Sequence, residues 1–150
     1  MNVPLYMDTL DESYYHPGLD EVHVPLQERC KTSACCSHTC AHELAHASGH
    51  KKRLNYLEPL RFGSEDYAKE ELRAEISACL ISAYTNEGLG QLEFENSNAY
   101  LDSWLTAVKD RPEEVVTACR RAAKTVDYML AGAGYADAAP EADLPAVLEV

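Results

Sequence analysis

The sequence predicts one α+β domain that is mostly helical, with a small N-terminal strand region and about four helices. Its 150 residues are 46% hydrophobic and 25% charged, ordinary values for a single globular domain. Apolar residues recur at helical spacing through most of the chain, and only residues 21–25 alternate apolar and polar as a strand does. Residues 133–150 contain acids, Ala, Gly and Pro but no basic residue. We therefore expect a folded domain over residues 1–132 and a flexible acidic tail over residues 133–150.

The strand region lies within the first thirty residues. Residues 14–18 contain Pro17 and Gly18, which are typical of a turn. Residues 21–25 alternate apolar and polar until Pro25 stops the pattern. Because proline cannot donate to a strand ladder, we expect this single short strand to be an edge strand.

The first helix is expected over residues 33–50. Ser64 is predicted to cap a second helix that runs to about Thr85, because acids in its first turn suit the helix dipole. A core-facing stripe on this helix consists of Leu72, Ile76 and Leu80. A third helix is predicted over residues 97–109. The fourth begins at Pro112, which suits a first helical position, and runs through residue 130.

Residues 42–46, His-Glu-Leu-Ala-His, are the strongest functional signal in the chain. Residues four apart lie on one face of a helix, so His42 and His46 can point their imidazoles at a single metal ion. Glu43 can reach a water molecule at that ion, as in zinc peptidases. Small or apolar neighbours and the absence of proline over residues 33–50 favour a buried helix here.

A catalytic zinc site needs a third protein ligand and an open position. The extended histidine motif that starts with His42-Glu43 and Gly49 would require histidine at position 52, which is Lys52. His50 is too far along the helix for one ion to bind it together with His42 and His46, because two four-residue steps span about 12 Å. The acidic run on the second helix therefore supplies the candidates. Glu71 is favoured as ligand, and Glu75 and Glu70 are the alternatives. Glu75, one turn beyond Glu71, suits a hydrogen bond to a ligand imidazole.

Charge and cysteine content limit the other functions. The net charge of −12 disfavours nucleic-acid binding by this chain alone. No apolar run is long enough to span a bilayer, and the N-terminus lacks the features of a signal peptide, so we expect a cytoplasmic protein. Six cysteines are then expected to be free and mostly buried thiols. A second metal site at Cys35, Cys36, His38 and Cys40 is disfavoured, because no distant Cys or His pair completes it.

Several separated motifs resemble the zincin-like metallopeptidase domain of ArdC-type antirestriction proteins. The similarity covers about residues 10–130, and its motifs lie at residues 14–15, 22–25, 42–50, 53–55, 61–75, 100–105 and 122–130. It implies a zincin-like fold whose third ligand is a glutamate on the next helix, in agreement with Glu71. It also implies a plasmid or phage context. Full-length relatives carry a domain that binds single-stranded DNA, for which this chain lacks room, so DNA binding is not carried over. The cysteine-rich entry to the His-bearing helix departs from the family pattern.

The predicted function is a zinc-dependent metallopeptidase that hydrolyses a protein or peptide substrate. Zn²⁺ would be held by His42, His46 and Glu71, with Glu43 as general base. Tyr67 is a candidate for the oxyanion, and the strand at residues 22–24 is a candidate for pairing with an extended substrate. The alternative is a non-catalytic interaction protein, in which the zinc site is structural or vestigial and the acidic surface mimics DNA. The sequence indicates neither the substrate nor the oligomeric state.

Overall fold

The structure is a computed structural model that describes residues 1–9, 11–57, 61, 63–85, 98, 101–102, 104–106 and 109–134. Its elements in chain order are β1 (Leu5–Asp8), β2 (Tyr14–His16), β3 (Glu21–Pro25), the 3₁₀ helix η1 (Gln27–Arg29), α1 (Ser33–Ser48), α2 (Glu65–Tyr84) and α4 (Pro112–Gly132). This is the predicted α+β class with a small sheet and a majority of helix.

The strands form one sheet in the order β1-β3-β2. β3 pairs with β1 in parallel and with β2 antiparallel, so it is the central strand. The prediction of an edge strand at residues 21–25 is therefore wrong. Pro25 occupies the last position of β3, where the N–H of Leu26 donates to the Asp8 carbonyl at 2.9 Å, so the proline removes no ladder bond. β1 and β2, the two partners of β3, give no clear strand pattern in the sequence, because both strands are short and mostly exposed.

Local chemistry sets the helix boundaries. Thr32 caps α1 by accepting from the Cys35 N–H at 2.9 Å. Ser64 caps α2 by accepting from the Tyr67 N–H at 3.2 Å, and Pro112 is the first residue of α4, both as predicted. α1 ends at Ser48 with Gly49 as its C-cap. A β-carbon at Gly49 would lie 3.3 Å from the His46 carbonyl oxygen, so a larger residue would be crowded at the end of α1.

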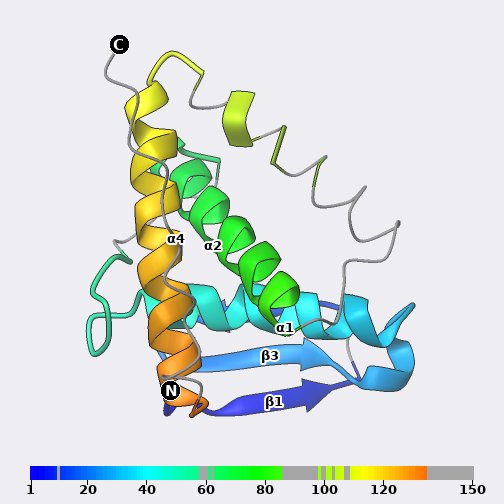
Figure 1. Ribbon diagram of the computed structural model, residues 1–150. Helices are drawn as coiled ribbons and strands as arrows, with labels where there is room; N and C mark the ends of the chain where they lie inside the picture. The colour runs from blue at the N-terminus through cyan, green and yellow to red at the C-terminus, as the bar shows by residue number, and fades with distance from the viewer. Residues whose placement is uncertain are drawn as a thin grey trace.

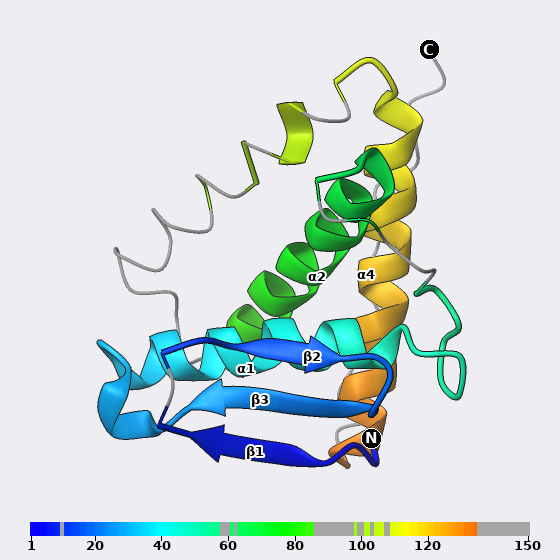
Figure 2. The ribbon, with the colours of Figure 1, turned by 180° about the vertical axis from the view of Figure 1, so that it is seen from behind.

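α1 is the central element of the molecule. It lies along one face of the sheet, and α2 packs on its other side, while α4 stands beside α2 and runs past α1 to the level of the sheet (Figures 1 and 2). One apolar cluster joins β3 to α1 through Val22, Val24 and Ala47. A second joins α2 to α4 through Leu72 and Ala118. Polar side chains are buried between these two clusters, where α1 faces α2.

The stripe predicted on α2 is buried only in part. Leu72 is 1% exposed, but Leu80 is 43% exposed, so its assignment to the core is wrong. Each four-residue step advances about 40° around a helix, so Leu80 lies about 80° from Leu72.

Two other predicted segments fall partly or largely outside the described residues. Of the predicted helix at residues 97–109, the described residues 98, 101–102 and 104–106 are helical. Residues 135–150 of the predicted tail lie outside the described part. Among the described residues, no helix combines the length and apolarity needed to cross a membrane.

Candidate metal centre and active-site cleft

Three side chains from two helices converge between α1 and α2. His42 Nε2 and His46 Nε2 lie 3.1 Å apart. Glu71 places one carboxylate oxygen 3.4 Å from His42 Nε2 and the other 3.7 Å from His46 Nε2. The three donor atoms all lie within 4.8 Å of one another. Two nitrogens and one carboxylate oxygen are a donor set that suits a divalent transition metal, and three protein ligands leave room for a fourth.

The other nitrogen of each histidine is also held by a carboxylate. His42 Nδ1 lies 3.0 Å from Glu75 Oε2, and His46 Nδ1 lies 3.0 Å from Glu70 Oε1. These contacts fix each ring orientation and favour the tautomer whose Nε2 lone pair faces the centre. Glu75 thus contacts the outer nitrogen of His42. Glu70, predicted only as an alternative ligand, contacts the outer nitrogen of His46.

Arg73 anchors Glu70 from behind and is 1% exposed. Its guanidinium donates to both Glu70 oxygens, with Nε 2.9 Å from Oε2. It also donates to Thr125 Oγ1 of α4 at 2.8 Å and to the Ala45 carbonyl of α1 at 2.9 Å. One buried cation thus links α1, α2 and α4 behind the candidate metal centre.

The electrostatics of the centre favour a bound cation. Burial opposes protonation of His42, but hydrogen bonds to Glu71 and Glu75 outweigh it and raise the pKa of His42 to about 10. Burial likewise raises the pKa of Glu70, but Arg73 and His46 hold the pKa of this carboxyl at about 2. Despite burial, the pKa of Glu71 is also lowered, mainly by its hydrogen bond to His42. Carboxylates therefore surround the two imidazoles with negative charge.

The centre opens into a cleft of about 700 Å³ between α1, α2 and the β2–β3 hairpin. Glu43 lines this cleft, is 7% exposed, and acts electrostatically on both His42 and Tyr67. Its carboxylate is not one of the three converging groups, so it remains available for proton transfer. Tyr67 lies on the cleft wall, where burial and a hydrogen bond to Glu71 raise the pKa of its hydroxyl. The Tyr67 hydroxyl thus contacts Glu71, the third candidate ligand.

Asp20 fixes the hairpin that forms one wall of the cleft. It pairs with Arg53, which follows α1, and it accepts from the Tyr15 hydroxyl at 2.8 Å and from Lys52 at 3.2 Å. The Arg53 hydrogen bond is the largest of the effects that hold the pKa of Asp20 well below its usual range. The backbone of Asp20 is left-handed, with φ of 60°. This cluster connects the sheet to the C-terminal end of α1.

Asp20→Asn is expected to make the protein less sensitive to acid. Because the folded pKa is below the unfolded value of about 3.9, the charge of Asp20 stabilises the fold above that pH and loses this effect as the pH falls. The wild-type free energy of unfolding should therefore fall more steeply below about pH 4, by up to about 1.4 kcal/mol per pH unit relative to the variant. Asparagine tolerates a left-handed backbone. Urea titrations between pH 2 and about 6 measure the slopes, and Asp11→Asn, on an exposed pair, is the control. Equal slopes in Asp20→Asn and wild type would contradict the role of Asp20.

The remaining candidates from the sequence have other surroundings. His50 is buried and lies 3.6 Å from Asp20 Oδ2, away from the three converging groups. All six cysteines are free, as predicted, but only Cys36 is buried and Cys119 is exposed, so the expectation of mostly buried thiols is wrong. Sequence reasoning missed Arg73, although an arginine between Leu72 and Ala74 on a core-facing helix is a sign of a buried charge. It also missed the pairing of Arg53 with Asp20.

Two histidines and a glutamate on one helix, with a carboxylate on the next, are an arrangement of the zincin class of metallopeptidase domains. The family model described as zincin-like metallopeptidase matches residues 4–121. The chain belongs to this family, which confirms the family resemblance and the zincin-like fold expected from the sequence.

Similar proteins include a DNA primase TraC of Escherichia coli, which is 39% identical over 121 residues, covering 81% of this chain and 8% of the primase. The Mn(II)-bound crystal structure of the antirestriction ArdC protein from plasmid R388 superposes with a TM-score of 0.74 at 32% identity. The superposition covers 87% of this chain and 48% of the ArdC chain. The metal-free ArdC structure gives a TM-score of 0.71 at 31% identity, over 88% of this chain and 47% of that one. The chain thus spans less than half the length of these relatives.

Proposed function

We propose that this chain is a metal-dependent peptidase whose resident ion is Zn²⁺, held by His42, His46 and Glu71. The convergence of the three donor atoms within 4.8 Å, beside the Glu43 carboxylate in an open cleft, carries the proposal. Membership of the zincin-like family supports it, and so does the Mn(II) bound by the ArdC neighbour. Free thiols at all six cysteines suit the reducing cytoplasm, where we place the protein.

When bound, the ion supplies Lewis-acid chemistry that activates water and polarises a carbonyl. Glu43 is positioned to accept the proton of the attacking water and to pass it to the departing amine. Glu75 and Glu70 fix the orientations of the His42 and His46 imidazoles, because a carboxylate oxygen of each glutamate lies 3.0 Å from one Nδ1. Tyr67 orients Glu71 through its hydroxyl. A role for Tyr67 at the oxyanion stays part of the proposal.

The substrate is proposed to be an extended peptide that pairs with β2. β3 cannot serve as suggested by the sequence, because it is paired on both sides. β2 is an edge of the described sheet, and Tyr14 and Tyr15 line the cleft. Pairing along an edge uses main-chain hydrogen bonds and therefore tolerates many substrate sequences.

Metal analysis of the purified protein tests the centre. Loading with one equivalent of Zn²⁺ should give one tightly bound ion per chain, and His46→Ala and Glu71→Ala should each lose this tight binding, because either change removes one of three protein ligands. Chelator should abolish cleavage of an unstructured protein, and added Zn²⁺ should restore it. Glu28→Gln, which changes an exposed glutamate, serves as the control. Unchanged zinc content in Glu71→Ala would exclude the assigned third ligand.

The rival proposal is a non-catalytic interaction protein, which the net charge of −12 favours. It predicts that the metal-loaded protein cleaves nothing and still inhibits a DNA-binding nuclease. Chelator-sensitive proteolysis that depends on Glu43 would exclude it.

A further inference from the structure

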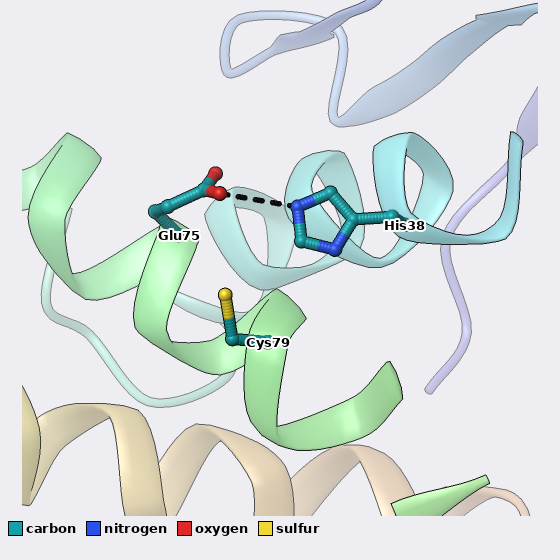
Figure 3. A group of neighbouring side chains, drawn as sticks. All are labelled: His38, Glu75 and Cys79. Carbon is teal, nitrogen blue, oxygen red and sulfur yellow. Dashed lines mark hydrogen bonds and ion pairs between the residues drawn. The ribbon is translucent and has the colours of Figure 1, made fainter. Parts of the chain in front are cut away.

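A second cluster of metal-binding side chains lies one helical turn from the first centre. It consists of His38 on α1 with Glu75 and Cys79 on α2, and their donor atoms all lie within 4.8 Å of one another. Figure 3 shows the three side chains facing one another across the space between the two helices. Within the described residues, this cluster and the centre at His42 are the groups whose donor atoms meet in this way.

The cluster uses the same two helices as the first centre, with one ligand on α1 and two on α2 in place of two and one. His38 precedes His42 by four residues on α1, and Cys79 follows Glu75 by four residues on α2. Each four-residue step advances about 6 Å along a helix, so both helices present a further set of ligands at the same offset. The two centres therefore stand about one turn apart along the same helix pair.

The environment of His38 is that of a metal ligand. Its side chain is 12% exposed and that of Glu75 is 5% exposed. His38 Nε2 lies 3.1 Å from Glu75 Oε1, while Nδ1 lies 3.3 Å from the Ser82 hydroxyl. Without a metal, the Glu75 carboxylate accepts from His38 Nε2–H. On binding an ion, the Ser82 hydroxyl can accept from Nδ1–H instead, which frees the Nε2 lone pair to face the ion, as outer partners of ligating histidines do.

The geometry points to a second binding site for a divalent transition metal such as Zn²⁺, formed by His38, Glu75 and Cys79. The mixed nitrogen, oxygen and sulfur donors select zinc-like ions over Ca²⁺ and Mg²⁺, which prefer oxygen. Protein ligands lie about 2.0 to 2.3 Å from zinc, so in tetrahedral geometry two donors on one ion are roughly 3.5 Å apart. The donors lie within 4.8 Å of one another, so side-chain movements of roughly 1 Å bring them onto one ion.

Glu75 connects the two sites. Oε1 faces His38 in the second site, and Oε2 accepts from His42 Nδ1 at the first centre. An ion on Oε1 withdraws negative charge from the same carboxylate, which weakens the hydrogen bond to His42. Occupation of the second site should therefore lower the affinity of the first.

Cobalt substitution of the full chain tests this site separately from the proposed peptidase. A thiolate bound to Co²⁺ gives a charge-transfer absorption band, and the first centre contains no sulfur. We expect two Co²⁺ ions per chain with a thiolate band, and we expect Cys79→Ser to lose the band and one ion. His46→Ala should lose one ion and keep the band. Cys119→Ser, on an exposed cysteine of α4, should behave as wild type.

Three results would overturn the second site: a single ion with no thiolate band in the wild type, a band that persists in Cys79→Ser, or a band that is lost in Cys119→Ser. Circular dichroism of Cys79→Ser checks that the fold is retained, and His38→Gln must reproduce the loss. A wild type that binds one ion without a band, and loses it in His46→Ala, would leave the first centre intact and exclude only the second.

Discussion

Glu43→Gln is expected to lower kcat for peptide hydrolysis by about 10²- to 10⁴-fold, the usual contribution of a general base. The amide has nearly the same shape as the carboxylate but cannot accept a proton from water. Because Glu43 is not among the groups that converge on the metal centre, the variant should keep its zinc and its stability.

Steady-state kinetics on a fluorogenic peptide and metal analysis of the same samples measure both properties. Glu28→Gln removes an exposed carboxylate from η1 and should keep wild-type kinetics. Wild-type turnover by zinc-loaded Glu43→Gln would contradict the role of Glu43 as base. Loss of zinc together with activity would instead make Glu43 a structural residue.

Arg73→Met should reduce the free energy of unfolding by about 3–5 kcal/mol, because it leaves the buried Glu70 carboxylate without its cation. Glu70 would then lose the groups that hold its oxygens in place, and His46 would lose a fixed partner. Affinity for zinc should fall by about 10- to 100-fold, as for other outer partners of metal ligands.

Urea denaturation and zinc titration measure the two effects. Arg120→Met, which changes an exposed arginine on α4, is the matched control. The double variant Glu70→Gln with Arg73→Met removes both charges and should recover much of the stability. A double variant no more stable than Arg73→Met alone would show that the loss does not arise from the unpaired carboxylate.

The helices and the candidate ligands were largely readable from the sequence, because the signals are local. Ser64 and Pro112 mark helix starts through their own backbone chemistry, and His42 and His46 share a face through simple periodicity. The relative rotation of two packed helices is not local. Whether Glu70, Glu71 or Glu75 faces a given imidazole depends on how α1 and α2 pack, so the contact of Glu70 with His46 emerged only from the structure.

The same limit explains the errors in the sheet and the second cluster. The central position of β3 depends on pairing with residues 5–8, which show no alternating pattern of their own. His38 was considered together with its neighbours Cys35, Cys36 and Cys40. Its observed partners, Glu75 and Cys79, are more than thirty-five residues away on another helix.

The bond between Arg73 and Thr125 sets a minimum length for a working fragment of this domain. The family match stops at residue 121, yet the α4 hydroxyl that satisfies the buried guanidinium lies at Thr125. A recombinant fragment that ended at residue 121 would lack Thr125, so the Arg73 guanidinium on α2 would lose this hydrogen bond. α4 is therefore needed even though it carries no metal ligand. Expression boundaries for this domain, alone or within longer fusions, should therefore extend to the end of α4.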